Sequence, residues 1–294
     1  MSGIAGGSRP LLLVVSVPVE IAEYAADLLW SAGAQAVEEI HPGKEIHPGE
    51  EIHPGATVDL RTDLGSEPLV VWATIVEANP DAREWSVREQ TVDARVADTW
   101  RQHATVTVVD DVSIVPAWLE NECDSTSGTA VLIEPGGSFG IGDHPTTRAS
   151  LALALRCPGS QVLDLGCGSG VLGITLALTR RASVVAVDVA PAAIEATRHN
   201  AHINEVIDLI VIEHGDVRCV RGTYDLVLAN ILAPVLLSDA DDIAARVAAR
   251  GTLIVSGFTD ARRPDIIARY STLGLFLREA TELEGWLALQ LERR

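Results

Sequence analysis

The second half of the chain alternates between short apolar runs and amphipathic stretches. Apolar runs typical of buried strands lie at Gln161–Leu165, Ser183–Asp188 and Tyr224–Ala229. Between them, apolar residues recur at helical spacing in Val171–Leu178 and Pro191–Asn204. Strands that alternate with helices predict a parallel sheet covered by helices on both faces.

Toward the carboxyl end this pattern continues and then changes. A helix is expected over Pro234–Ala249, a strand over Gly251–Ser256 and a helix over Arg262–Leu273. Two strand-like runs, Leu275–Thr281 and Gly285–Leu291, then follow with only a short turn between them. Because a short turn cannot make a parallel crossover, these runs predict an antiparallel hairpin. The expected fold class is therefore α/β, with a doubly wound, Rossmann-like, mostly parallel sheet that closes with an antiparallel hairpin.

The amino-terminal residues predict a smaller α+β unit of the ferredoxin-like kind. Around one helical pattern at Glu20–Ala32, apolar runs of strand length lie at Leu11–Val17, Ala34–Ile40, Thr57–Arg61 and Leu69–Ala78. The pattern then becomes polar and helical, with Trp85 and Trp100 as large apolar residues. We therefore expect an amino-terminal domain over residues 1–80, a helical linker over 81–104 and the larger domain over 105–294.

A short repeat with a histidine at every sixth residue lies within the small unit. The stretch IHPGKEIHPGEEIHPG carries His41, His47 and His53, each followed by Pro-Gly. A metal site needs ligands fixed at set distances by supporting groups, whereas Pro-Gly favours turns at the surface. Our interpretation is a solvated loop without a metal, and the alternatives are a contact surface for a protein substrate or a metal site.

Composition and charge limit the partners. The net charge is −19, from 41 acidic and 22 basic side chains. Nucleic-acid binding needs a basic face, so direct nucleic-acid contact is not expected. No apolar run approaches the ~20 residues of a membrane span. The four cysteines lack metal-type spacing or a dense disulfide pattern, which predicts a cytoplasmic protein, and we expect a monomer.

The strongest chemical signal is the sequence VLDLGCGSG at residues 162–170. A buried strand here runs into three glycines, Gly166, Gly168 and Gly170, which allow a tight turn and close approach of a ligand. The spacing is GxGxG rather than the GxGxxG of dinucleotide-binding proteins, so a nicotinamide cofactor fits poorly. The next strand ends in Asp188, 22 positions after Gly166, where a carboxylate can accept both hydroxyl groups of a ribose. The turn and the acid together predict a nucleoside ligand.

These residues resemble the class I S-adenosylmethionine-dependent methyltransferases. In many of those enzymes an acidic residue contacts the adenine amine at the position of Asp216, although a turn or helix-capping aspartate explains this residue equally well. Two further motifs narrow the resemblance, FGIGDHPTT before the sheet and ANILAP after the fourth strand. At this distance on either side of DLGCGSG, the pair is similar to the PrmA family, the bacterial ribosomal protein L11 methyltransferases. Further similarities are the early strand–helix–strand, the Glu84-Trp85 pair, the IVPAW segment and the ending EGWLAL, so the resemblance covers nearly the whole chain.

The resemblance implies a cofactor and the residues that hold it. S-adenosylmethionine would be bound by Thr147, Gly166, Gly168, Asp188 and Asn230. The family pattern has threonine where this chain has Ile141, so no role is assigned to that position. For His144, a functional role and a helix-capping or loop-packing role stay open.

The resemblance also implies a reaction. Methyl groups would pass to the α-amine and lysines of ribosomal protein L11, a basic substrate that suits the acidic charge. Asn230 would be the catalytic residue, because its side-chain carbonyl can accept hydrogen bonds from the attacking amine. Ile231 and Leu232 offer no ring for stacking a nucleobase, which agrees with a protein substrate. The alternatives are a lysine methyltransferase of another protein, a small-molecule amine methyltransferase, and a module that senses S-adenosylmethionine without catalysis.

Overall fold

The chain forms two compact units, residues 1–104 and 105–294. The computed structural model describes residues 11–31, 37–40, 57–62, 68–91, 105–122, 128–134 and 142–294. The IHPG repeat after Ile40 and the substituted position Ile141 lie outside the described residues, so the interpretations given to them stay predictions.

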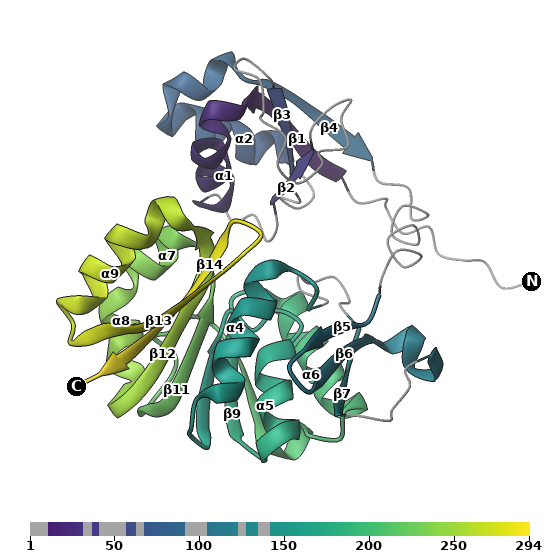
Figure 1. The fold of residues 1–294 in the computed structure, drawn as a ribbon. Coiled ribbons are helices and arrows are strands. Elements are labelled where there is room, and N and C mark those ends of the chain that lie inside the picture. The colour runs from purple at the N-terminus through teal and green to yellow at the C-terminus, as the bar shows by residue number, and fades with distance from the viewer. Residues whose placement is uncertain are drawn as a thin grey trace, which may run out of the picture. The chain divides into compact units, whose positions relative to one another are not determined.

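The amino-terminal unit is an antiparallel sheet with two helices on one face (Figure 1). Its elements are β1 (Leu11–Pro18), α1 (Ala22–Ser31), β2 (Val37–Ile40), β3 (Thr57–Thr62), α2 (Pro68–Ala78) and β4 (Ser86–Thr91). The strand order is β2-β3-β1-β4, with every neighbouring pair antiparallel. This β-α-β-β-α-β arrangement is the ferredoxin-like one. Alternate residues Leu13, Val15 and Val17 of β1 face both helices, while Ser16 points to the other side, where it bonds to Arg88 at 3.0 Å.

The strand expected over Leu69–Ala78 is wrong, because Pro68–Ala78 is helix α2. The run is apolar throughout, so periodicity alone does not separate a buried strand from a helix. The structure buries Trp72 and Ile75, which are three residues apart, and leaves Leu69 and Val70 exposed. This spacing is that of one helical face.

The helical linker over 81–104 is also wrong in its described part. Pro80–Glu84 forms a short 3₁₀ turn, and Ser86–Thr91 is strand β4, which pairs with β1. The boundary expected at residue 80 is therefore misplaced, since the small unit needs β4 to complete its sheet. β4 shows little hydrophobic alternation because most of its side chains are exposed, which explains why its sequence did not indicate a strand. Residues 92–104 lie outside the described part.

The larger unit begins with a small sheet of three strands. They are β5 (Thr107–Val109), β6 (Val112–Pro116) and β7 (Thr129–Ile133), in that order across the sheet. β6 pairs antiparallel with β5 and parallel with β7. A 3₁₀ turn, Ala117–Glu122, follows β6.

The main sheet has seven strands in the order β10-β9-β8-β11-β12-β14-β13 (Figure 1). They are β8 (Gln161–Leu165), β9 (Ser183–Asp188), β10 (Ile210–His214), β11 (Tyr224–Asn230), β12 (Val247–Thr259), β13 (Leu275–Leu283) and β14 (Trp286–Arg293). The first five are parallel, and β14 lies antiparallel between β12 and β13. The parallel sheet and its closing antiparallel hairpin are thus confirmed.

Helices cover both faces of this sheet, as predicted. They are α4 (Pro145–Arg156), α5 (Val171–Arg180), α6 (Pro191–Ile203), α7 (Ala233–Ser238), α8 (Ala240–Arg246) and α9 (Arg263–Ser271). Along β11, Leu226 and Leu228 pack with α4 and α5 on one face, whereas Val227 and Ala229 pack with α7, α8 and α9 on the other. The strands are apolar throughout because each side of the pleat is buried. The single helix expected over Pro234–Ala249 is two short helices, and β12 begins at Val247.

A bulge in β12 lets the chain after β11 approach it. The pairing of β12 with β14 shifts register between Ser256 and Phe258, at Gly257, which has φ +97°. A Cβ atom on Gly257 would lie 2.5 Å from the carbonyl oxygen of Ile231, which is closer than atoms can approach. Only glycine therefore fits here, for its φ angle and for its lack of a side chain.

Gly257→Ala should lower the free energy of unfolding by roughly 2–4 kcal/mol, because alanine adds both backbone strain and a clash. Gly222→Ala is a matched control, since Gly222 has φ +80° and open space where a Cβ would be. The control should lose only about 1 kcal/mol, the backbone cost alone. Denaturant titration of both variants measures the difference, and equal losses would contradict the argument from close approach.

Candidate functional site

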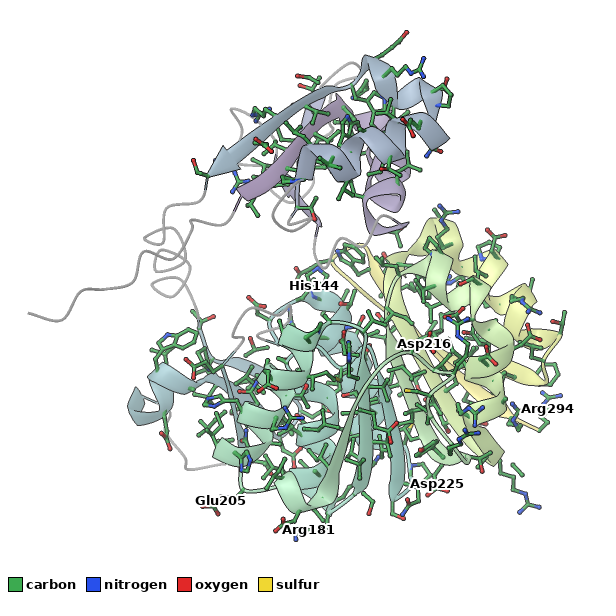
Figure 2. All side chains as sticks on the ribbon, turned by 180° about the vertical axis from the view of Figure 1, so that it is seen from behind. His144, Arg181, Glu205, Asp216, Asp225 and Arg294 are labelled. Atoms are coloured by element: carbon green, nitrogen blue, oxygen red, sulfur yellow. The ribbon has the colours of Figure 1, made fainter. Side chains whose placement is uncertain are left out.

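The candidate site lies where the strand order of the main sheet reverses direction. From β8 the chain continues to β9 and β10 on one side, and then returns to β11 and β12 on the other. In doubly wound sheets the carboxyl ends of the strands at such a reversal form a ligand-binding crevice. Figure 2 shows His144 and Asp216 toward one end of this sheet and Arg181 and Glu205 toward the opposite end.

The glycine turn follows β8 directly. The backbone N–H groups of Gly166 and Cys167 both donate to the carbonyl of Val187 in β9, at 2.8 and 3.1 Å. Gly166, Gly168 and Gly170 all have positive φ angles, between 56° and 81°, which glycine adopts without strain. A Cβ atom on Gly166 would lie 2.3 Å from the side chain of Ile231, just after β11. The turn therefore fills the space between the ends of β8 and β11 with backbone alone.

Asp188 ends β9, beside the turn. Its two carboxylate oxygens each accept one backbone N–H at 2.9 Å, from Gly168 and from Ala190. These bonds fix the plane of the carboxylate, and each oxygen keeps a further acceptor position. The side chain is only partly buried, so those positions can receive ligand hydroxyl groups.

Asp164 is a second carboxylate below the turn, and it has a different environment. It is fully buried, and its Oδ2 accepts the N–H of Gly173 in α5 at 2.9 Å. Burial raises its pKa to about 7, the Gly173 hydrogen bond opposes this rise, and the charge of Asp188 adds to it. A Cβ on Gly173 would lie 3.0 Å from that oxygen and 2.9 Å from Val184, so the contact requires glycine. Asp164 holds helix α5 against the strand, whereas Asp188 is partly exposed at the end of β9.

Asn230 and Thr147 come together from distant parts of the chain. Asn230 is the last residue of β11, and Thr147 lies in the first turn of α4. The side-chain nitrogen of Asn230 lies 3.5 Å from the Thr147 hydroxyl oxygen, at the outer limit of a hydrogen bond. Thr147 is buried and Asn230 is partly exposed. Of the predicted site residues, the structure therefore gathers Gly166, Gly168 and Asp188 in one group and Thr147 and Asn230 in another, at the ends of neighbouring strands.

His144 caps helix α4. Its Nδ1 accepts the backbone N–H of Thr146 at 3.3 Å and lies 2.8 Å from the hydroxyl of the same residue. The capping interpretation is therefore confirmed. Burial lowers the pKa of the imidazole, although Asp143 and Glu284 act in the opposite direction. A neutral ring suits a helix amino terminus, where positive charge is unfavourable.

The tip of the closing hairpin also contacts the start of α4, which the sequence did not predict. The ring of Trp286 meets that of His144 edge to face, with 5.0 Å between centroids. Glu284 and Arg148 form an ion pair at 2.8 Å. The EGW ending had indicated only a resemblance, because a strand-end tryptophan does not reveal which distant loop it will touch.

Asp216 acts as a turn residue in the structure. Its carboxylate accepts the backbone N–H of Arg218 at 2.8 Å and the guanidinium of the same residue at 2.7 Å. The guanidinium holds the pKa of Asp216 below its usual value. These contacts show the turn role, and the contact to an adenine stays a prediction.

Sequence reasoning missed Thr197 in α6. Its hydroxyl donates to the carbonyl of Gly168 at 3.0 Å, so a helix side chain holds the glycine turn from behind. The residue is completely buried. A threonine on the apolar face of an amphipathic helix was the available signal, because a buried hydroxyl needs a partner.

The polar groups and the glycine backbone of this site are of the kinds that bind S-adenosylmethionine. Backbone without side chains lies at Gly166, a fixed and accessible carboxylate lies at Asp188, and polar groups lie beyond the turn at Asn230 and Thr147. The acidic residue matches a ribose diol, and the glycine turn allows the rest of a nucleoside to approach. Together with the strand order, these features define a class I S-adenosylmethionine-dependent methyltransferase.

Comparison with known proteins gives the family. Residues 11–294 match the family model of ribosomal protein L11 methyltransferase (PrmA). A ribosomal protein L11 methyltransferase from an Exiguobacterium species is 34% identical over 236 residues, which cover 78% of this chain and 70% of that protein. One from Chloroflexus aurantiacus is 33% identical over 221 residues, which cover 66% of this chain and 67% of that protein. The chain belongs to the ribosomal protein L11 methyltransferase family, and its enzymatic class is protein methyltransferase.

A solved structure agrees with this assignment. The ribosomal protein L11 methylase of Lactobacillus delbrueckii subsp. bulgaricus aligns with a TM-score of 0.61 and 26% sequence identity. The alignment covers 65% of this chain and 100% of that one. None of the helices in the described residues is long and apolar enough to cross a membrane.

Asp164→Asn should change how stability depends on pH. In the folded protein the pKa of Asp164 is raised to about 7, whereas an exposed aspartate titrates near 3.8. Well below pH 3.8 the carboxyl is protonated in both states, so the wild type carries no penalty. As pH rises from 4 to 7 the unfolded state ionises first, and folding stability is lost by at most about 1.4 kcal/mol per pH unit.

The neutral asparagine does not titrate, so the stability of the variant relative to wild type should rise across this window and level off above pH 7. Urea titration of both proteins between pH 4 and 8 measures this difference. A difference that stays constant with pH would show that the pKa of Asp164 is the same in the folded and unfolded states.

Proposed function

We propose that this protein transfers methyl groups from S-adenosylmethionine to the α-amine and lysine side chains of ribosomal protein L11. The observation that carries the proposal is the meeting of Asn230 with Thr147 at the strand end beside the glycine turn. Asn230 is the proposed catalytic residue, and Thr147, Gly166, Gly168, Asp188 and Asn230 are the proposed cofactor-binding residues.

The cofactor, when bound, supplies a methyl group that is already activated by its sulfonium. The remaining task of the protein is to orient the acceptor nitrogen toward that methyl group. Asn230 is suited to this task because its side-chain nitrogen is directed to Thr147. Within the described residues this is the one hydrogen bond of the Asn230 side chain, so its carbonyl oxygen is left to accept an N–H of the acceptor amine.

The acceptor must lose a proton before it can attack. A lysine amine has a reference pKa of ~10.4 and an α-amine one of ~7.7–8.0, so the α-amine is deprotonated far more readily at neutral pH. Nearby positive charge lowers either value. We propose that the proton leaves before the amine binds or passes to water, and that Asn230 then orients the neutral amine.

The amino-terminal unit is proposed to hold the substrate protein. Leu69 and Val70 support this role, because they expose 44% and 61% of their surface on the solvent side of α2. The net charge of −19 would attract a basic ribosomal protein. We further propose a cytoplasmic monomer without direct contact to nucleic acid or membrane, in agreement with the free thiols of Cys157, Cys167 and Cys219.

Asn230→Ala should lower kcat for methylation of ribosomal protein L11 by about 100-fold at saturating cofactor, because the amine loses its orienting acceptor. Asn230→Asp keeps an acceptor oxygen and should lose markedly less activity. Initial rates with radiolabelled S-adenosylmethionine measure both variants. Full turnover by the alanine variant would remove Asn230 from the mechanism.

A chain that begins at Thr105 should keep cofactor binding and lose methylation of ribosomal protein L11. The test incubates this chain and the full-length protein with labelled cofactor and total ribosomal proteins, and then identifies the labelled band and residues. Full length should label the α-amine and lysines of L11. If another protein carries the label, the substrate is wrong, and if the short chain labels L11 equally well, the recognition role of the amino-terminal unit is wrong.

A further inference from the structure

Asn200 of helix α6 and Asn204, the C-cap residue of that helix, form the same kind of hydrogen bonds with two residues at the end of β7: Glu134, which follows the strand directly, and Leu132 within it. Asn204 accepts the backbone N–H of Leu132 at 2.9 Å and donates to the carbonyl of Leu132 at 2.6 Å. Asn200, one helical turn earlier, accepts the N–H of Glu134 at 2.9 Å and donates to the carbonyl of Glu134 at 2.9 Å. Both side chains are buried. Each amide therefore bonds to the strand as a neighbouring peptide group would.

The spacing of helix and strand explains why this pairing fits. Four residues of an α-helix span about 6 Å and two residues of a strand span about 6.6 Å. Alternate residues of a strand direct their N–H and C=O groups to the same edge, and the other edge of β7 is paired with β6. The asparagines thus cover the open edge of β7, and the small sheet is fastened to α6.

The two asparagines differ in their remaining hydrogen bond. The second N–H of the Asn204 amide donates to the carbonyl of Asn200, one turn earlier in α6, at 2.7 Å. The second donor of Asn200 goes to the carbonyl of Ser169 in the glycine turn, at 2.8 Å. Asn200 therefore bonds to the glycine turn and to the end of β7 at once, whereas Asn204 bonds only to β7 and α6.

The glycine turn depends on such external bonds. It contains three glycines, whose backbone has the most freedom to lose on folding, and its own residues supply few restraining side chains. The Asp188 carboxylate accepts the N–H of Gly168, and the Thr197 hydroxyl donates to the Gly168 carbonyl. The Asn200 side chain donates to the carbonyl of Ser169. Of these three side chains, Asn200 also bonds to Glu134 at the end of β7, within the described part of the chain.

We propose that Asn200 is a positioning residue for cofactor binding, which sets the glycine turn by fastening the Ser169 carbonyl to the carboxyl end of β7. The inference rests on the proposed function, in that the glycine turn is taken as the cofactor site. Asn200 does not touch the cofactor. It acts through the backbone of the turn, and its loss removes the hydrogen bonds that it makes to Ser169 and Glu134.

The experiment compares Asn200→Ala with Asn204→Ala in the full-length protein. N200A removes two bonds to Glu134 and N204A removes two bonds to Leu132, so both should unfold at a lower temperature than wild type. Calorimetric titration with S-adenosylhomocysteine should show about 10-fold weaker binding for N200A, because the turn is no longer fixed, and less than about 3-fold weaker binding for N204A. At saturating cofactor the kcat of N200A should stay within about 3-fold of wild type, so that the change appears in KM.

Equal Kd values for the two variants would overturn the proposal, whether both bind normally or both bind weakly, because β7 anchoring alone would then explain the result. If either alanine variant fails to fold, Asn200→Ser and Asn204→Ser replace them with the same criterion. Wild-type protein that does not bind S-adenosylhomocysteine would overturn the proposed cofactor site itself, which separates failure of the function from failure of this inference.

Discussion

The geometry at the carboxyl end of the main sheet depends on the hydrogen bonds that fix the glycine-rich turn after β8. Gly166, Gly168 and Gly170 have no side chains that could form stabilising contacts, so hydrogen bonds from residues outside the turn must fix its backbone. The Val187 carbonyl holds its beginning, and the Asp188 carboxylate holds its middle, at 2.8 and 2.9 Å respectively. Because these partners belong to β9, the order of the strands decides the shape of the turn.

Two carboxylates near this turn, Asp164 and Asp188, differ in role because they differ in burial. Asp164 is fully buried, and the loss of water raises its pKa to about 7. Asp188 is partly exposed and bonded to two backbone N–H groups, which leaves further acceptor positions on its oxygens. The sequence places both at the ends of apolar strands, and burial separates the structural acid from the accessible one.

Much of the larger unit could be predicted because its strands and helices obey clear periods. The strands at Gln161–Leu165 and Ser183–Asp188 have the predicted bounds, and the closing hairpin lies where its short turn required. The smaller unit was less predictable. The apolar run at Pro68–Ala78 suits a strand or a helix, and only packing against β1 and β4 favours the helix. The polar strand β4 lacks a buried face, so pairing with β1 defines it.

The sequence by itself determined the motifs that can bind a nucleoside, since a tight glycine turn and a strand-end acid are local requirements of the chain. It also determined the family, through motifs spread over most of its length. Tertiary structure alone decided which distant groups meet. Thr147 approaches Asn230 across 83 positions, Trp286 packs on His144, and Asn200 joins the glycine turn to β7. Such contacts depend on strand order and helix packing, which a local pattern does not encode.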